Sequence, residues 1–369
     1  MINPIAFAVP VFLLAIVAEV VVARRRDVRV MRFDDAMGDL ACGITSQGIG
    51  VFLKLATVPL YAVAFRRLSV VSWAEGSPWP WLIGIVGYDL CYYWWHRQSH
   101  ERNALWAVHV VHHQSDDFNL AVALRQDWFG PLTSAVFGLP LALLGVPPEV
   151  YLASLSINLL YQFWIHTELI GRLGAFERFF NSPSHHRVHH GTNPQYLDKN
   201  YGGILIVWDR IFGTFEDEVE RPAYGITTQF RSFDAVHANV AYWREIVALA
   251  RQRPTWVSGL AVLVEPPGHD PNAGRVVHGA FDPERLKFRA TKLSAASHVY
   301  LVVSFLGSVV LLLWMLENEA SLPLTRLALG AAVLICLSVG WSALLEARGR
   351  TLAWSLGGTG LFAGLLAWH

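Results

Sequence analysis

Charged side chains are scarce in this chain. Asp, Glu, Lys and Arg make up only 16% of its 369 residues, whereas 53% of the residues are hydrophobic. A soluble protein of this size carries about a quarter charged residues. The composition therefore predicts an integral membrane protein, all-α and polytopic, with one substantial polar part.

Cysteine and basic runs are scarce as well. Cys42, Cys91 and Cys336 lie in apolar segments without the spacing of a metal site or a disulfide framework, so we interpret them as small core residues. The net charge is zero and no long Lys/Arg run stands outside the loops. These features exclude nucleic acid as a partner.

A cleavable signal peptide is also missing from the N-terminal sequence. The charges of Arg24, Arg25 and Arg26 follow the apolar run instead of preceding it, and no small-residue cleavage site is evident. We expect a retained transmembrane helix with these arginines on the cytoplasmic side.

Apolar stretches long enough to span a bilayer recur along the chain. They cover 4–23, 38–65, 79–95, 127–146, 148–166, 296–316, 322–342 and 351–368. The stretches at 127–146 and 148–166 are separated by Pro147 and Pro148 and are expected to form a hairpin that enters the membrane and returns.

Following these spans from cytoplasmic arginines gives a topology. The third span then ends on the cytoplasmic side at His96, and the hairpin returns His166 to the same side. All clustered histidines thus lie on one face of the membrane. Arg66 and Arg67 conflict with this topology, because it places them outside.

Histidine, in contrast, is abundant and clustered. Ten of the fifteen histidines fall between residues 96 and 190, where an even scatter would place about four. They form the strings HRQSH (96–100), HVVHH (109–113) and HHRVHH (185–190), with His166 alone between them. Neutral imidazole is the commonest metal ligand in proteins. Because so many imidazoles exceed the needs of one ion, the sequence predicts two bound metals.

The spacing within each string places imidazoles on one face of a helix, since positions i, i+3 and i+4 are neighbours there. In the last string Ser182 is the expected N-cap, Pro183 the first helical residue and Gly191 the end of the helix. The expected ligands are His96, His100, His109, His112, His113, His186, His189 and His190. His166, at the end of a span, is a further candidate, and for His185 we leave open a role as ligand or as neighbour of one.

The identity of the metals follows from the number of ligands. Histidine suits zinc, iron, copper and nickel. A catalytic zinc takes three protein ligands and a water, which is fewer than are present here, and no HExxH string occurs. Two irons that activate dioxygen suit a nitrogen-rich site beside lipid, because oxidation of an unactivated C–H bond requires activated oxygen.

Carboxylates near the strings are candidates to orient the imidazoles, since a metal-bound histidine donates its second N–H to a carboxylate or carbonyl. Asp89 lies two helical turns before His96, and an ionisable residue within a span is a functional hypothesis. Glu101 adjoins His100. We expect both carboxylates to belong to the catalytic site.

Polar residues next to the strings are candidates for binding a headgroup or a cofactor. They are Lys199, Asn200 and Tyr201 after the last string, whose alternative role is to turn the chain. Arg125 and Gln126 after the second string are candidates for holding a polar headgroup.

The strings and the segments between them resemble the fatty acid hydroxylase/sterol desaturase superfamily of membrane di-iron enzymes. HRQSHE (96–101), HVVHH, His166 and HHRVHH match that superfamily in order and spacing through about residues 80–216. Within it, ALRQ (123–126), SPSHHRVHHG (182–191), DKNYGG (198–203) and WDRIFGTFE (208–216) are most similar to the alkylglycerol monooxygenase branch.

This resemblance implies an activity and a cofactor set. One iron is held mainly by the first strings and the other by the last. Dioxygen hydroxylates the carbon next to an ether oxygen, and the hemiacetal collapses to a fatty aldehyde and a glycerol. Tetrahydrobiopterin is the external reductant implied. We expect transmembrane helices in 1–78 and 296–369, the hydroxylase-like catalytic domain in 79–216 and a cytoplasmic cap in 217–295.

Two other functions remain open at the level of sequence. A hydroxylase or desaturase of sterols, carotenoids or fatty acids has the same histidine set, and its product is a stable alcohol or a new double bond. A metal transporter or sensor would line a path through the spans with histidines, whereas here they gather at one surface.

Overall fold

Long helices make up most of the chain. The computed structural model describes residues 4–270, 275–276, 282, 287–348 and 357–358. Its longer helices are α1 (Pro4–Arg25), α2 (Phe33–Leu68), α3 (Trp79–Glu101), α4 (Asn103–His113), α5 (Gly130–Leu143), α6 (Pro148–Trp164), α9 (Ala235–Arg251), α11 (Ala295–Asn318) and α12 (Leu324–Leu345).

Shorter elements occupy the polar segments between these helices. They are the 3₁₀ turns η1 (Val122–Leu124) and η2 (Gly174–Arg178), the helices α7 (Pro183–His189), α8 (Val207–Phe212) and α10 (Trp256–Ala261), and the antiparallel strands β1 (His269–Asp270) and β2 (Arg275–Val276). The prediction of a helical protein is therefore confirmed over the described residues, apart from this pair of two-residue strands.

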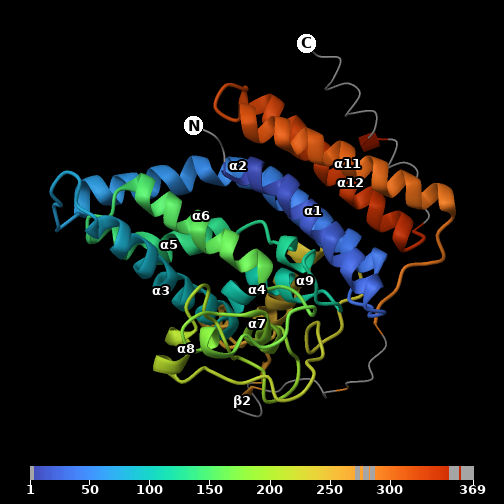
Figure 1. The fold of residues 1–369 in the computed structure, drawn as a ribbon, viewed down its shortest axis with the longest axis horizontal. Coiled ribbons are helices and arrows are strands. Elements are labelled where there is room, and N and C mark those ends of the chain that lie inside the picture. Colours follow the sequence, from blue (N-terminus) through green and yellow to red (C-terminus); the bar gives the residue numbers. More distant parts are fainter. Residues whose placement is uncertain (1–3, 271–274, 277–281, 283–286, 349–356, 359–369) are drawn as a thin grey trace.

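Within the part of the chain that the structure describes, four helices are long and apolar enough to cross a membrane: α1, α2, α11 and α12. They share a core that also receives α9, and Figure 1 shows α1, α11, α12 and the first part of α2 running close together. At about 1.5 Å per residue, the 36 residues of α2 extend well beyond the roughly 30 Å of a hydrocarbon core. The C-terminal part of α2 therefore reaches a second group of helices.

That second group consists of α3, α5 and α6, with α3 contacting both of the others. Its core is rich in tyrosine. The rings of Tyr61 on α2 and Tyr151 on α6 stack at 3.9 Å, and the Tyr61 hydroxyl donates to the carbonyl of Val146 at 2.9 Å. This packing orients α3 and α6, which end at the histidine site.

Several of the expected spans differ from the helices that form. Helices are present at 79–95, 127–146 and 148–166, but α5 and α6 have only 14 and 17 residues, and α3 carries Asp89 and many amphipathic aromatic residues. None of these three meets the length and hydropathy of a spanning helix. The expected span at 351–368 lies outside the described residues except for 357–358.

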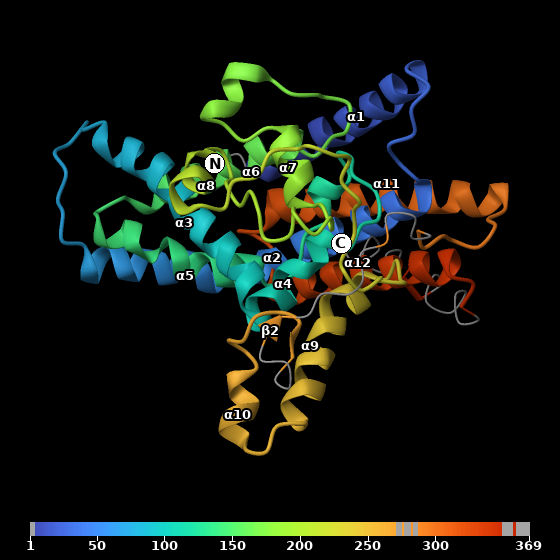
Figure 2. The same cartoon turned by 90° about the horizontal axis from the view of Figure 1, so that it is seen from below.

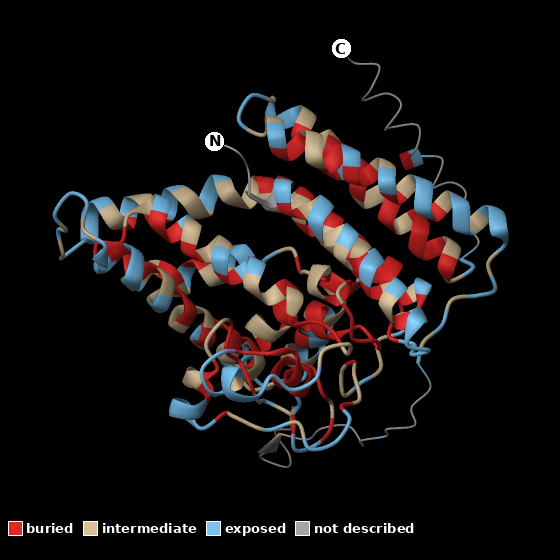
Figure 3. Cartoon of the chain, in the orientation of Figure 1, coloured by how far each residue is buried: buried red, intermediate tan, exposed pale blue. Residues whose placement is uncertain are grey.

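The segment between α8 and α11 contains α9 and α10, which project from the rest of the molecule in Figure 2. Asp234 is the N-cap of α9, and its carboxylate accepts hydrogen bonds from the N–H groups of Val236 and His237. The helix packs against α4. Figure 3 shows buried residues concentrated where α4, α7 and the loops around them meet. The polar part of the chain is thus densely packed around the histidines.

Candidate metal centre

Four helices bring nine of the ten clustered histidines together. α3 supplies two from its last turns, α4 three from its second half, α6 one just past its end and α7 three with its C-cap. The potential ligand atoms form two groups, within each of which they lie no more than 4.8 Å apart. We call them group A (His96, His100, His109, His113, His189) and group B (His112, His166, His186, His190).

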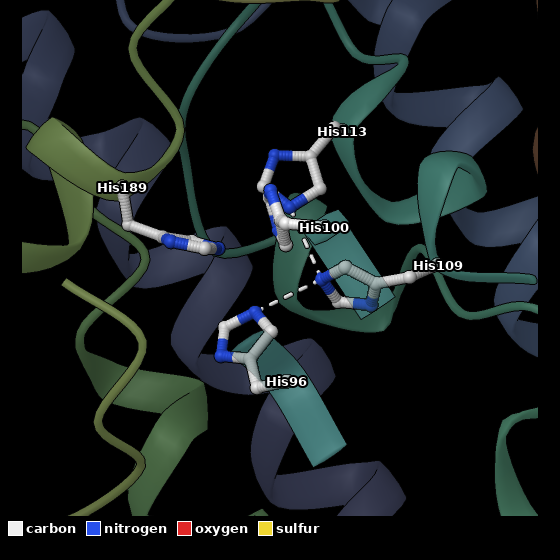
Figure 4. Close-up of side chains that lie close together, drawn as sticks. All are labelled: His96, His100, His109, His113 and His189. Carbon is white, nitrogen blue, oxygen red and sulfur yellow. Dashed lines mark hydrogen bonds between the residues drawn. The ribbon is translucent and has the colours of Figure 1, made fainter. Parts of the chain in front are cut away.

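In group A the imidazoles converge on one another. The Nε2 atoms of His96 and His109 are 2.9 Å apart, and those of His113 and His109 are 3.1 Å apart. Figure 4 shows the five rings surrounding a common centre. The Nε2 atoms of His100 and His189 are buried without a hydrogen-bond partner. Buried imidazole nitrogens without a partner carry a desolvation cost that a metal ion would offset.

Group B has the same character. Its Nε2 atoms form a chain of short separations, 3.1 Å from His166 to His112, 2.9 Å from His186 to His166 and 3.2 Å from His190 to His186. All four residues are buried. The donor set of both groups fits a borderline transition-metal ion such as iron.

Backbone carbonyls fix the orientation of four rings. Each carbonyl oxygen accepts a hydrogen bond from Nδ1, which leaves Nε2 free to bind a metal. The pairs are His96 with Tyr201 at 2.8 Å, His189 with Lys199 at 2.9 Å, His112 with Arg125 at 3.0 Å and His166 with Gln162 at 2.7 Å.

Burial keeps the imidazoles neutral. It lowers the pKa of His112 to about 4, and it lowers the pKa values of His113, His189 and His190 well below the ordinary value, with neighbouring histidines as a further cause. A neutral imidazole is the form that binds a metal. The site is therefore ready to bind cations at neutral pH.

The loop at 198–201 carries two of those carbonyls, of Lys199 and Tyr201, and places them next to group A. Asp198 and Asn200 both have left-handed backbones, with φ of 59° and 57°, a conformation that Asp and Asn tolerate better than most residues. The Asn200 side chain donates to the carbonyls of His185 and Glu216, at 3.1 Å and 2.8 Å. Lys199 and Asn200, expected to contact a headgroup or cofactor, thus have a structural role in turning the chain and orienting His189.

Tyr201 lies against group A. Its ring centroid is 5.2 Å from that of His100, and its buried hydroxyl has no hydrogen-bond partner. Its backbone N–H donates to Asp209 at 2.7 Å, and burial raises the pKa of Asp209 to about 6. Of the three residues after the last string, Tyr201 places its side chain nearest to the histidines.

Asp89 and Glu101 contact other partners than the histidines they were expected to orient. Asp89 is buried and accepts four hydrogen bonds, from the N–H groups of Ile204 and Leu205, from Trp208 Nε1 and from Asn158 Nδ2, at 2.7–3.0 Å. It anchors the loop that carries the Tyr201 carbonyl, so its effect on His96 is indirect. Glu101 pairs with Arg97 at 2.8 Å and accepts from Gln98 at 2.8 Å.

The side chains of His185 and Arg125 both contact residues outside the two groups. His185 lies outside both groups, its ring against Phe215 at 5.4 Å, and burial lowers its pKa to about 4. The Arg125 guanidinium is buried and bonded to Asp39, to Gln114 and to the carbonyl of Val111. It secures α4 to α2, which leaves it no role in holding a lipid headgroup.

Sequence reasoning missed a polar stripe on α6 that leads to the site. Asn158 Oδ1 accepts from Gln162 Nε2 at 2.6 Å, while Asn158 Nδ2 donates to Asp89 at 2.7 Å. The Gln162 carbonyl accepts from His166 at 2.7 Å. The signal was available, because Asn158, Gln162 and His166 recur every four residues in an apolar segment and so share one helical face.

Comparisons with known proteins agree with this site. Residues 81–214, which contain all the histidines of both groups, match the fatty acid hydroxylase family. The chain is 39% identical to human alkylglycerol monooxygenase over 74% of its own length and 62% of the relative's. It is 37% identical to the Xenopus tropicalis protein of the same name over 72% of its own length and 59% of the relative's. It is also 28% identical to human lathosterol oxidase over 45% and 57%.

The chain covers only part of each relative that it matches. The chain spans about three-fifths of the length of the alkylglycerol monooxygenases that it matches. No solved structure matches it significantly. Residues 81–214 thus match the fatty acid hydroxylase family, in a chain that is similar to alkylglycerol monooxygenases over about three quarters of its length.

Proposed function

We propose that this protein is a membrane di-iron monooxygenase that hydroxylates an ether lipid with dioxygen, giving a fatty aldehyde and a glycerol derivative. The observation that carries the proposal is the division of nine histidines, eight of them buried, into two groups of potential ligands. Two groups suit two irons, one for each. The similarity to alkylglycerol monooxygenases supports the substrate class.

The chemistry needs a reductant as well as a metal. Iron bound at the two groups would supply the activation of dioxygen. One oxygen atom enters the C–H bond beside the ether oxygen, and the other leaves as water with two electrons and two protons from an external donor. The resulting hemiacetal breaks its ether C–O bond, which leaves the aldehyde and the free alcohol. A tetrahydropterin is the donor class we propose, by similarity to the relatives.

The residues of the chain hold and orient the reacting groups. His96, His100, His109, His113 and His189 would bind one iron, and His112, His166, His186 and His190 the other. Backbone carbonyls present the Nε2 atoms, and burial of the imidazoles excludes bulk water, which protects a reactive centre from side reactions. His185 is proposed as a neighbour of the ligands and not as a ligand.

An ether lipid is favoured over a sterol by the extent of similarity. The alkylglycerol monooxygenases match 72–74% of the chain, which is well beyond the hydroxylase domain, whereas lathosterol oxidase matches 45%. We further propose that the site faces the cytoplasm, because Arg24–Arg26 follow the first candidate span and cytoplasmic loops carry the excess of basic residues.

The experiment combines metal analysis with product identification. Full-length protein in nanodiscs is expected to hold two irons and to convert a 1-O-alkylglycerol to the fatty aldehyde only with dioxygen and a tetrahydropterin. A sterol and a free fatty acid serve as competing substrates. A stable alcohol or an alkene from either, without aldehyde from the ether, would assign the chain to another activity of the superfamily.

A matched pair of variants tests the ligands. His189→Ala is expected to abolish turnover and to lower the iron content. The control is His237→Ala, because His237 lies on α9 outside both groups, with its ring stacked on Phe230. This variant should retain both turnover and iron content. Full turnover in His189→Ala would contradict the assignment of His189 to group A.

A further inference from the structure

An exposed apolar surface lies beside the histidine site, on η2 and α8. Its six large side chains are each more than a third exposed: Leu173, Phe176, Phe179, Phe180, Ile211 and Phe212. Hydrogen bonds join the two segments, from the N–H of Ile206 to the carbonyl of Phe179 at 3.0 Å and from Arg210 to the carbonyl of Glu177 at 3.2 Å. We call this surface the η2–α8 patch. Neighbouring exposed apolar side chains on a folded chain mark interaction sites.

The patch continues onto the outer faces of two long helices. Phe212 lies against α3, with its ring 5.2 Å from Tyr93 and 5.0 Å from Trp94. Phe176 lies 6.3 Å from Trp164 at the end of α6. α3 itself exposes Trp79, Leu82, Val86 and Trp94, which recur at helical spacing and form one apolar stripe that ends at the patch.

Arginine accompanies the aromatic residues. Arg172, Arg178 and Arg210 are all exposed on the same two segments, whereas Glu177 between them is half-buried and accepts a hydrogen bond from the Ser182 hydroxyl at 2.7 Å. Aromatic side chains together with arginine are typical of surfaces that lie in the headgroup layer of a membrane. Basic residues there favour anionic lipids.

We propose that the η2–α8 patch lies in the headgroup layer of the membrane and contacts anionic phospholipid. The continuity with the apolar faces of α3 and α6 argues for lipid over a protein partner, because one surface then meets both the acyl chains and the headgroups. Asp209 of α8 also accepts from the N–H groups of Tyr201 and Gly202, at 2.7 Å and 2.8 Å. The patch therefore sets the depth at which group A meets the membrane.

Spin labels measure that depth directly. Phe179→Cys and Ile211→Cys, with 60% and 62% exposed side chains, are labelled with a nitroxide in full-length protein in nanodiscs. Val219→Cys is the control, since Val219 is equally apolar and 72% exposed but lies between Glu218 and Glu220. Labelling of the native cysteines is measured in the parent chain and subtracted.

The relaxation of the three labels by oxygen and by a nickel complex decides the proposal. We expect oxygen to relax the labels at positions 179 and 211 more strongly than a water-soluble nickel complex does, with the reverse at position 219. Equal access of the nickel complex at all three positions would overturn the proposal, and so would spin–spin broadening that reveals contact between two copies of the chain.

The arginines provide a separate test of the lipid. Adding phosphatidylglycerol to phosphatidylcholine nanodiscs should move the label at position 179 deeper, and Arg178→Gln should reduce this shift. Arg67→Gln, at the far end of α2, is the matched control and should leave the shift of the label at position 179 unchanged. An absence of any dependence on phosphatidylglycerol, or an equal dependence in both variants, would overturn the assignment of anionic phospholipid.

Discussion

Four imidazoles of the two groups are oriented by an atom that binds their second nitrogen. In this chain that atom is a backbone carbonyl for His96, His112, His166 and His189. A carbonyl has no residue-type signature, so the sequence cannot identify it. Asp89, which was expected in this role, acts one step further away by fixing the loop that carries the Tyr201 carbonyl, whereas Glu101 pairs with Arg97 on its own helix.

Asp89→Asn tests this indirect role. Asp89 accepts hydrogen bonds from four donors, and the amide NH₂ of asparagine would face two of them. Those two donors would lose their acceptor, and a buried donor without an acceptor costs about 1–3 kcal/mol. We expect a lower melting temperature and a loss of iron from group A, because the loop bearing the Tyr201 carbonyl would no longer be anchored. Iron content and thermal unfolding are measured in parallel.

The control for this change is Asp217→Asn, since Asp217 is exposed and lies after the same loop. It should leave both measurements unchanged. A purely structural role for Asp89 would lower the melting temperature of Asp89→Asn while the iron content of the folded fraction stayed at the parental value.

At the scale of the element, the strings divide between the groups by a simple rule. Residues four apart on a helix differ by about 40° around its axis, whereas successive residues differ by about 100°. The pairs His96/His100, His109/His113 and His186/His190 accordingly each stay within one group. The remaining histidines of the strings, His112 and His189, each belong to the group that does not contain the pair on their own helix. The expectation that each string points one way was therefore too coarse.

Helix α7 was the best-predicted element, and it serves both groups. Ser182 is its N-cap, Pro183 is its first residue, and His190 is its C-cap just before Gly191, as the sequence indicates. What the sequence did not indicate is how this helix is held. Arg187, between two ligands, pairs with Glu218 at 2.6 Å and donates to the carbonyls of Thr167 and Ile170.

Arg187→Lys should disturb both groups together. Lysine keeps the charge but cannot reproduce the bidentate pair with Glu218 and the two carbonyl contacts. Loss of a buried, hydrogen-bonded ion pair of this kind costs roughly 3 kcal/mol. We expect a lower melting temperature and a decrease of iron in both groups, measured by metal analysis and by the spectrum of the ferric protein.

An exposed pair on the same side of the molecule provides the comparison. Arg221 is 79% exposed and lies 3.3 Å from Glu168. Exposed ion pairs contribute little to stability, so Arg221→Lys should behave like the parent. Equal effects of the two variants would show that α7 is held by something other than Arg187.

For the whole molecule, the sequence predicted the site better than the membrane topology. The local spacing of histidines and the order of the strings determine which residues meet. The number of spans depends on tertiary packing, because α3, α5 and α6 associate around tyrosines and fall short of the length or hydropathy of independent spans. The extra length of α2 connects the two helical groups, and hydropathy alone gives no sign of this connection.

The two groups join parts of the fold that are far apart in the sequence. Group A links α3, α4 and α7, and group B links α4, α6 and α7. A ligand that binds only the folded state stabilises it by about 4 kcal/mol at a thousand times its dissociation constant. Bound metal should therefore stabilise these helices more than α11 and α12, which contribute no histidine to either group.

Removal of metal by a chelator under reducing conditions tests this difference by hydrogen exchange. We expect faster exchange in α4, α7 and the loop at 198–206, since the imidazoles of the metal-free site leave several buried nitrogens unpaired. Exchange in α11 and α12 should stay unchanged, because their contacts are with α1, α2, α9 and one another. Iron added back should restore slow exchange in the parent but not in His189→Ala at α7. A uniform increase over all helices would mean that the metals stabilise the fold as a whole and not through the four helices that bear the ligands.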